Sequence, residues 1–191
     1  MNAPKRDDHR CARFRTLYEN NYDAILGYTL RRAPQADALD VVAETFLVAW
    51  RRLERVPVGD DARLWLYGTA RRVLANHVRA ERRRARLGGR LTAAAATSAH
   101  ATQEQPVGAV ASAFARLQAA DRELLALAAW EGLDAREIAR ALGCSRNAAR
   151  IRLHRARRRF ADALAEEDES AKREEPAGHV SLTAIRTEDS Q

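Results

Sequence analysis

Two blocks of the sequence, residues 12–87 and 107–165, repeat their apolar side chains with the period of an α-helix and contain few glycines or prolines. Neither block shows the strict alternation of apolar and polar residues that marks a half-buried strand. The segment between them, 88–106, is small, polar and aperiodic, which predicts a flexible linker. The sequence therefore predicts an all-α protein made of two small helical domains, since each block is long enough to form a compact bundle.

Charge is distributed unevenly along the chain. The residues from Asp162 to Gln191 hold nine acidic and three basic side chains, whereas the whole chain has a formal net charge of +7. The body of the protein is therefore strongly basic, which favours a polyanion as partner. The charged segment 1–11 and the acidic segment 166–191 are both expected to be disordered, because neither can bury an apolar core.

Several classes of protein are excluded by what the sequence lacks. It has no run of eighteen apolar residues, so no membrane span is expected, and its first residues lack the apolar centre of a secretory signal. Cys11 and Cys144 fit neither a zinc spacing nor a disulfide framework. We therefore expect a cytoplasmic protein that has reduced thiols and needs no metal or other cofactor.

The second block has the pattern of a helix-turn-helix. Asp121 is expected to cap one of its helices. Asp134 and Glu137 have the spacing of a capping box at the start of a short helix, and Gly143 suits the left-handed position that ends this helix. Ser145 is then expected to cap the next helix. Two short helices joined by such a turn form a helix-turn-helix, and this spacing favours the DNA-binding version.

The helix after Ser145 has two different faces. Ala149, Leu153, Ala156 and Phe160 fall at i, i+4, i+7 and i+11, which predicts a buried stripe. Arginines occupy most of the remaining circumference. Side chains at the start of a recognition helix contact base edges, where arginine suits guanine and asparagine suits adenine, while later arginines suit phosphates. The expected contacts to duplex DNA are Ser145, Arg146, Asn147, Arg150, Arg152 and Arg155.

The first block combines an acidic edge with a basic helix. Asp37, Asp40 and Glu44 recur at i, i+3 and i+7, an arrangement that on its own is typical of a solvated face. Further on, Trp65 precedes a helix that ends in a cluster of arginines. Aromatic side chains beside arginines suit single-stranded nucleic acid, because unstacked bases need a flat surface, although packing in the core is the alternative role for Trp65.

Three segments in order, DVVAETFLVAWRRL, ARLWLYGTARRVLANHVRAERRR and LGCSRNAARIRLHRARRRF, closely resemble the extracytoplasmic-function (ECF) group of bacterial sigma factors. The resemblance covers residues 12–87 and 107–165. It implies that the first domain binds core RNA polymerase and recognises and opens the −10 element, while the second binds the −35 element as duplex. It implies no catalytic residues, since the polymerase carries the chemistry. The implied partners are promoter DNA, the clamp coiled coil and flap of the polymerase, and an anti-sigma factor, which often holds family members inactive.

The resemblance also assigns residues to each surface. The loop before Trp65 would hold a flipped −10 base, around residues 55–63. Arg72 and Asn76 replace a common asparagine and a common aspartate, and Ala148 lacks the usual hydroxyl. The implied polymerase-binding residues are Asp37, Asp40, Glu44, Phe46 and Trp50. The implied −10 residues are Trp65, Arg72, Asn76, Arg79, Arg82 and Arg83, and the −35 residues are the duplex contacts named above.

Two other functions compete with this interpretation. A helix-turn-helix repressor or activator that is no polymerase subunit would usually bind a palindrome as a dimer, but the sequence shows no dimerisation heptad. A nuclease or recombinase would need a cluster of acids or an Arg/His constellation that the sequence lacks.

Opening a duplex costs about 1.4 kcal/mol per stacked step, so the free protein is expected to bind promoters weakly.

Overall fold

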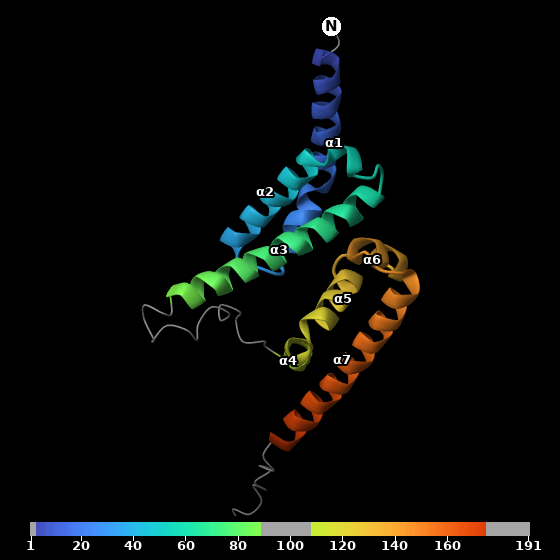
Figure 1. Cartoon of the computed structure of the whole chain (residues 1–191). Coiled ribbons are helices and arrows are strands. Elements are labelled where there is room, and N and C mark those ends of the chain that lie inside the picture. The colour runs from blue at the N-terminus through green and yellow to red at the C-terminus, as the bar shows by residue number, and fades with distance from the viewer. Residues whose placement is uncertain (1–2, 89–107, 175–191) are drawn as a thin grey trace, which may run out of the picture.

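The computed structural model describes residues 3–88 and 108–174, and throughout these residues the chain is helical or irregular, without a strand (Figure 1). This confirms the predicted all-α fold for the described part. The elements in order are α1 (Ala3–Leu30), α2 (Gln35–Arg51), the 3-10 turn η1 (Leu53–Arg55), α3 (Asp61–Gly88), α4 (Ala109–Arg116), α5 (Ala119–Ala129), α6 (Ala135–Leu142) and α7 (Arg146–Glu174).

Helices α1, α2 and α3 form the first domain, and aromatic side chains join α1 to α2. The ring of Phe46 on α2 lies 4.7 Å from that of Tyr18, and the ring of Trp50 lies 5.2 Å from that of Phe14. On the other side of α2, Val41, Thr45 and Ala49 are fully buried in the bundle. Helix α2 therefore buries one side against α1 and another against α3.

The N-terminal segment corrects one prediction, because residues 3–11 continue α1 and are not disordered. Arginine side chains attach this part of α1 to the end of α2. Arg10 donates to the carbonyl of Trp50 at 3.0 Å and lies 4.5 Å from its ring, and Arg13 donates to the carbonyl of Val56 at 2.7 Å. These bonds satisfy carbonyls that the end of α2 and the following turn leave without a helical partner.

The second domain, α4 to α7, contains the predicted helix-turn-helix in α6 and α7. Asp134 accepts from the N–H groups of Arg136 and Glu137, and the Glu137 carboxylate accepts from the N–H of Asp134, which completes the capping box. These backbone bonds, with that to Glu137 foremost, lower the pKa of the Asp134 carboxyl. Gly143 has φ +67°, and the Ser145 hydroxyl accepts from the N–H of Ala148 at 3.2 Å. All three predicted signals are confirmed.

Asp121 has a different role from the predicted one. It lies inside the first turn of α5, whose N-cap is Gln118, and it is buried. Both of its carboxylate oxygens accept from Arg159 on α7, at 2.8 and 3.0 Å. The aspartate therefore joins two helices, and the need to pair a buried charge outweighs its preference for the cap position.

Helix α7 also continues beyond its predicted end, since residues 166–174 are helical where disorder is expected. Arg116 on α4 forms ion pairs with Glu166 and Glu167, which attach this part of α7 to the domain. The remaining parts of the predicted linker and tail, 89–106 and 175–191, lie outside the described residues, as do residues 1–2. The boundaries of the two domains therefore stay a prediction.

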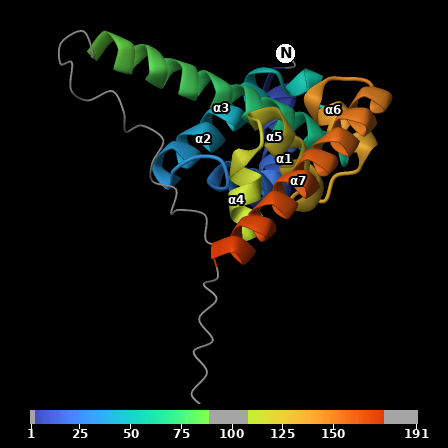
Figure 2. The same cartoon turned by 90° about the horizontal axis from the view of Figure 1, so that it is seen from below.

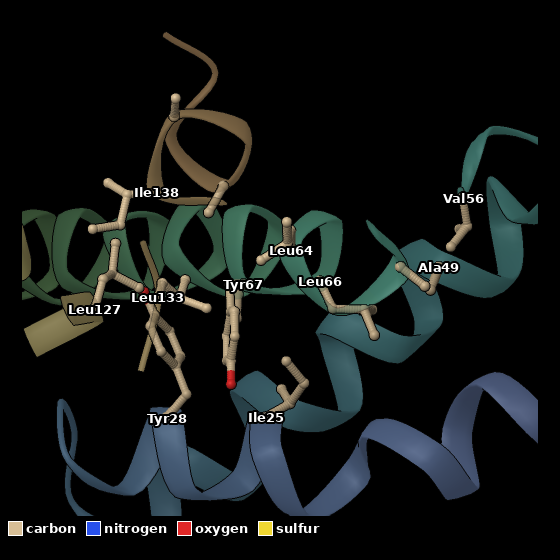
Figure 3. Packing of buried hydrophobic residues seen from close by; sticks show 14 of the residues in the cluster. Ile25, Tyr28, Ala49, Val56, Leu64, Leu66, Tyr67, Leu127, Leu133 and Ile138 are labelled. Carbon is tan, nitrogen blue, oxygen red and sulfur yellow. The ribbon is translucent and has the colours of Figure 1, made fainter. Parts of the chain in front are cut away.

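The two domains lie against each other, which the sequence does not predict. Helix α6 packs on α3, and one apolar core runs through both domains. Figure 3 shows Tyr28 and Tyr67 of the first domain beside Leu127, Leu133 and Ile138 of the second. The C-terminal half of α3 extends away from this contact, as the second view shows (Figure 2).

In residues 3–88 and 108–174, no helix is both long and apolar enough to cross a membrane.

The turn at Gly143 gives a first prediction. Gly143→Ala should lower the free energy of unfolding by about 1–2 kcal/mol, because a Cβ disfavours a left-handed backbone. The measurement is urea unfolding followed by circular dichroism. Gly27→Ala is the matched control: this glycine lies inside α1, where alanine is the better helix former, and the added Cβ would meet only the flexible side chain of Arg31. Equal effects at both positions would contradict the prediction.

Candidate protein and nucleic-acid interfaces

The outer face of α2, defined by Leu39, Asp40, Ala43 and Leu47, is exposed to solvent. Leu39 and Leu47 are 47% and 45% exposed and lie about two turns apart on this face. Sequence reasoning missed these two leucines as a surface feature, although their i, i+8 spacing opposite the buried stripe was a signal. An exposed apolar strip next to an acid is typical of a protein-binding surface.

The five residues expected to bind polymerase divide between the two sides of α2. Asp40 is exposed and makes no ion pair with the described residues, while Asp37 and Glu44 lie half-buried at the edge of the outer face. Phe46 is only 3% exposed, and Trp50 is partly buried against Phe14. In this structure Phe46 can influence a partner only by fixing the position of α2.

Glu44 connects α2 to the basic helix α3. Its carboxylate lies 3.1 Å from Nε2 of His77, and both side chains are partly exposed. His77 directly follows Asn76, one of the expected −10 residues. The acidic edge of α2 and the basic face of α3 therefore meet at this hydrogen bond.

The expected −10 residues of α3 form a stripe along the helix rather than a pocket. Arg72, Asn76, Arg79 and Arg83 recur at i, i+4, i+7 and i+11 and are exposed, with Arg82 beside them. Arg72 and Arg79 each donate to the carbonyl four residues earlier, which holds their guanidinium groups along the helix. Trp65 lies at the start of α3, seven residues before Arg72 and so on the same face of the helix, but it is partly buried against the core.

A hollow of about 450 Å³ lies at the end of α2, where the loop to α3 begins. It is lined by Arg10, Arg51, Arg52, Leu53, Glu54 and Arg55. It overlaps the predicted base pocket of residues 55–63 only at Arg55. Sequence reasoning missed the other three arginines; Arg10 belongs to the N-terminal segment predicted to be disordered, and Arg51 and Arg52 lie at the end of α2.

The start of α7 presents the expected −35 residues to solvent. Arg146, Asn147, Arg150, Arg152 and Arg155 are all exposed. The side-chain oxygen of Asn147 accepts from Arg150 at 3.1 Å, so these two side chains form one polar unit. The Ser145 hydroxyl is already engaged as the helix cap.

The stripe beneath these residues is buried as predicted. Ala149, Leu153 and Ala156 are at most 6% exposed, and Phe160 is partly buried with its ring 6.4 Å from that of Phe114. This packing fixes which side of α7 faces outward.

Among residues 3–88 and 108–174, no cluster of His, Cys, Asp or Glu side chains could hold a metal ion.

Neighbouring residues of α2 give a second prediction. Phe46→Ala should lower the free energy of unfolding by about 3–5 kcal/mol, because it opens a cavity in the aromatic cluster. Leu47→Ala should change it by less than about 0.5 kcal/mol, since this side chain is exposed. Urea unfolding of both variants is the measurement, and similar losses would contradict the assignment of the two faces.

Family models match both domains. The model described as sigma-70 region 2 matches residues 17–84, and the model described as sigma-70 region 4 matches residues 108–160. The first match falls on the bundle of α1, α2 and α3. The second covers α4, α5, α6 and the recognition part of α7.

Two relatives from Mycobacterium tuberculosis resemble the chain in sequence. The ECF RNA polymerase sigma factor SigL is 32% identical over 152 residues, which span 75% of this chain and 84% of the relative. The ECF RNA polymerase sigma factor SigC is 34% identical over 120 residues, which span 62% of this chain and 65% of the relative.

Two known structures share the fold. The sigma factor RpoE, in complex with the anti-sigma factor NepR from Bartonella quintana, has a TM-score of 0.59 and 20% identity, covering 80% of this chain and 96% of RpoE. CnrH, in complex with the cytosolic domain of CnrY, has a TM-score of 0.53 and 24% identity, covering 80% of this chain and 88% of CnrH. Taken with the two region matches and the identity to SigL, the helical bundle and the helix-turn-helix show that the chain belongs to the ECF family of RNA polymerase sigma factors.

Proposed function

We propose that the protein binds core RNA polymerase and directs it to promoters, with the first domain recognising and opening the −10 element and the second binding the −35 element. The observation that carries this proposal is the match of both sigma regions in order. In both domains the side chains assigned to partners are mostly exposed on helices whose opposite faces are buried.

The outer face of α2 is the proposed contact with the clamp coiled coil of the largest polymerase subunit. Leu39 and Leu47 supply apolar area that becomes buried on binding, and Asp40 supplies an unpaired charge at the centre. Apolar burial gives affinity, while complementary charge gives specificity and a fast on-rate. Glu44 and Asp37 extend the acidic edge.

The stripe on α3 is the proposed track for the −10 strand. Its arginines neutralise phosphates, and Asn76 is placed to contact a base edge. The hollow lined by Arg51, Arg52 and Arg55 is a separate basic region before the start of α3, and its size and charge suit a phosphate of the same strand. Trapping a few bases cannot offset the cost of opening a duplex, so melting requires the polymerase.

The start of α7 is the proposed −35 reader. Arg146, Asn147 and Arg150 occupy the end of the recognition helix that enters the major groove, and Arg152 and Arg155 lie further along toward the phosphates. The bond between Asn147 and Arg150 must open or reorient before both side chains contact bases. No catalytic step is assigned to this chain, since the polymerase carries the chemistry.

The remaining partners follow from the same assignment. The relatives RpoE and CnrH are known in complexes with the anti-sigma factor NepR and the cytosolic domain of CnrY. We propose that an anti-sigma factor also controls this protein. We propose further that this protein works in the cytoplasm with the polymerase, whose flap receives the second domain. A repressor that uses only the helix-turn-helix would leave the region 2 domain without a role.

Run-off transcription tests the proposal and gives a third prediction. Purified core polymerase with the protein should produce discrete transcripts from fragmented genomic DNA that the core alone does not. Asp40→Arg should reduce them at least roughly tenfold, because it places a like charge opposite a basic partner. Glu19→Arg is the control, since it makes the same change of charge at an exposed position of α1. Tight duplex binding without transcripts would support the repressor instead.

The recognition helix gives a fourth prediction. Arg150→Ala should lose about 1–3 kcal/mol of discrimination between the correct −35 sequence and single-base variants. Arg157→Ala, an exposed change further along the same helix, should weaken binding to all sequences equally. Competition binding of the polymerase complex to a set of −35 duplexes measures both. A uniform effect of Arg150→Ala would remove it from the base-reading residues.

A further inference from the structure

One apolar side chain lies in the middle of the arginine-rich surface of α7. Ile151 is 39% exposed, and it is not part of the apolar core of the described helices. Residues 146–160 contain seven arginines and no acidic residue, so the charged side chains around Ile151 on this helix are all positive. A single exposed apolar side chain is ordinary on a protein surface, so the position of Ile151 decides whether it has a role.

The buried stripe of α7 fixes where Ile151 points. Ala149, Leu153 and Ala156 are buried, and successive residues turn by about 100° around a helix axis. Ile151 is two residues away from both Ala149 and Leu153, which places it about 160° around the helix from each of them. It therefore lies at the centre of the face that is opposite the core.

The neighbours of Ile151 on this face are residues assigned to the −35 element. Asn147 lies one turn before it and Arg155 one turn after it, since residues four apart lie one above the other. Ile151 is the sixth residue of α7, within the part of a recognition helix that contacts base edges. Ala148, three residues earlier, has only a methyl group and does not shield Ile151 from a partner. In the proposed function, Ile151 is therefore the apolar member of the base-reading surface.

The major groove offers one apolar group to such a side chain. The base edges there present hydrogen-bond donors and acceptors, and the C5-methyl group of thymine is the exception. Isoleucine has no side-chain donor or acceptor, so against any other edge it would displace water from polar groups without replacing their hydrogen bonds. Against a thymine methyl group, both partners instead remove apolar surface from water. The same side chain thus favours one base and disfavours the others.

Helix geometry also limits where this thymine lies. Asn147 and Ile151 are about 6 Å apart along the axis of α7, because each residue of a helix rises about 1.5 Å. Successive base pairs of the duplex are about 3.4 Å apart. The thymine is therefore expected within about two base pairs of the base that Asn147 contacts.

We propose that Ile151 reads the C5-methyl group of a thymine in the −35 element. This rests on the proposed −35 role of α7 and adds a specificity-determining contact to it. 5-Methylcytosine carries the same methyl group on the same carbon, so the chemistry that Ile151 recognises is that of a 5-methylpyrimidine. The experiment below separates these two sources.

Selection from random duplexes locates the thymine. The full-length chain is used at low salt, where phosphate contacts strengthen binding. The wild type should select a site with an invariant thymine, within about two base pairs of the position that changes in Asn147→Ala. Ile151→Ser should select the same site without a preference at that base pair, since serine accepts several bases. A wild-type site that lacks an invariant thymine, or a thymine that stays invariant in Ile151→Ser, would overturn the proposal.

Removal of the methyl group alone is the decisive measurement. Uracil keeps the hydrogen-bonding groups of thymine and lacks only the C5-methyl group. In competition binding, uracil at the selected position should weaken wild-type binding about fourfold, the effect expected from burying roughly one methyl group. Ile151→Val keeps a branched apolar side chain and should retain most of this difference, whereas Ile151→Ser should bind both duplexes equally. Tighter binding of a duplex with 5-methylcytosine than of the thymine duplex would overturn the choice of thymine.

Val110→Ser is the matched control, because it makes the same kind of change at a β-branched residue of α4 that is 62% exposed. It should keep the wild-type preference for thymine over uracil. Circular dichroism should show that both serine variants are folded, since each replaced side chain is exposed. Loss of the preference in Val110→Ser as well would show that the effect does not come from Ile151.

Run-off transcription separates this proposal from the assignment as a sigma factor. A protein that supports transcription but binds thymine and uracil duplexes equally would lose the methyl contact and keep the sigma function. A protein that distinguishes the two duplexes through Ile151 but supports no transcription would keep the methyl contact and lose the sigma function.

Discussion

The buried carboxylate of Glu131 is the interaction on which the arrangement of the whole chain depends. It follows α5 of the second domain and pairs with Arg31 and Arg32, which directly follow α1 in the first. Without these arginines it would be an unpaired charge in a nearly dry site, which costs several kcal/mol. Together with the approach of α6 to Gly68, this makes two small bundles into one continuous core. Each surface that we propose to meet polymerase or DNA is displayed around that core.

Local signals predicted the second domain well. The capping box at Asp134, the left-handed Gly143 and the cap at Ser145 each involve residues within a few positions of one another, so their pattern is complete in the sequence. The same holds for the stripe of α7 and for its exposed arginines. These elements placed the −35 candidates on an outward-facing helix, and the structure agrees with that placement.

Contacts between distant residues could not be predicted in the same way. The partners of Glu131 lie about a hundred positions earlier, and Asp121 pairs with Arg159 instead of capping its helix. Arg10 orders the first turns of α1 by stacking on Trp50, although its own segment reads as a charged tail. The motif assigns Phe46 to a partner because it lies beside surface acids, whereas tertiary packing turns it inward. In each case the deciding contact comes from another helix.

Helix α3 has a mechanical consequence beyond its separate contacts. It runs without interruption from Asp61 to Gly88, so the part against α6, the part bonded to α2 through His77 and the part that bears the basic stripe belong to one stiff rod. No hinge interrupts this helix, so a displacement of one end also moves the other end. In the proposed function, the seating of α2 on its partner and the alignment of the promoter strand on α3 are for this reason movements of a single body.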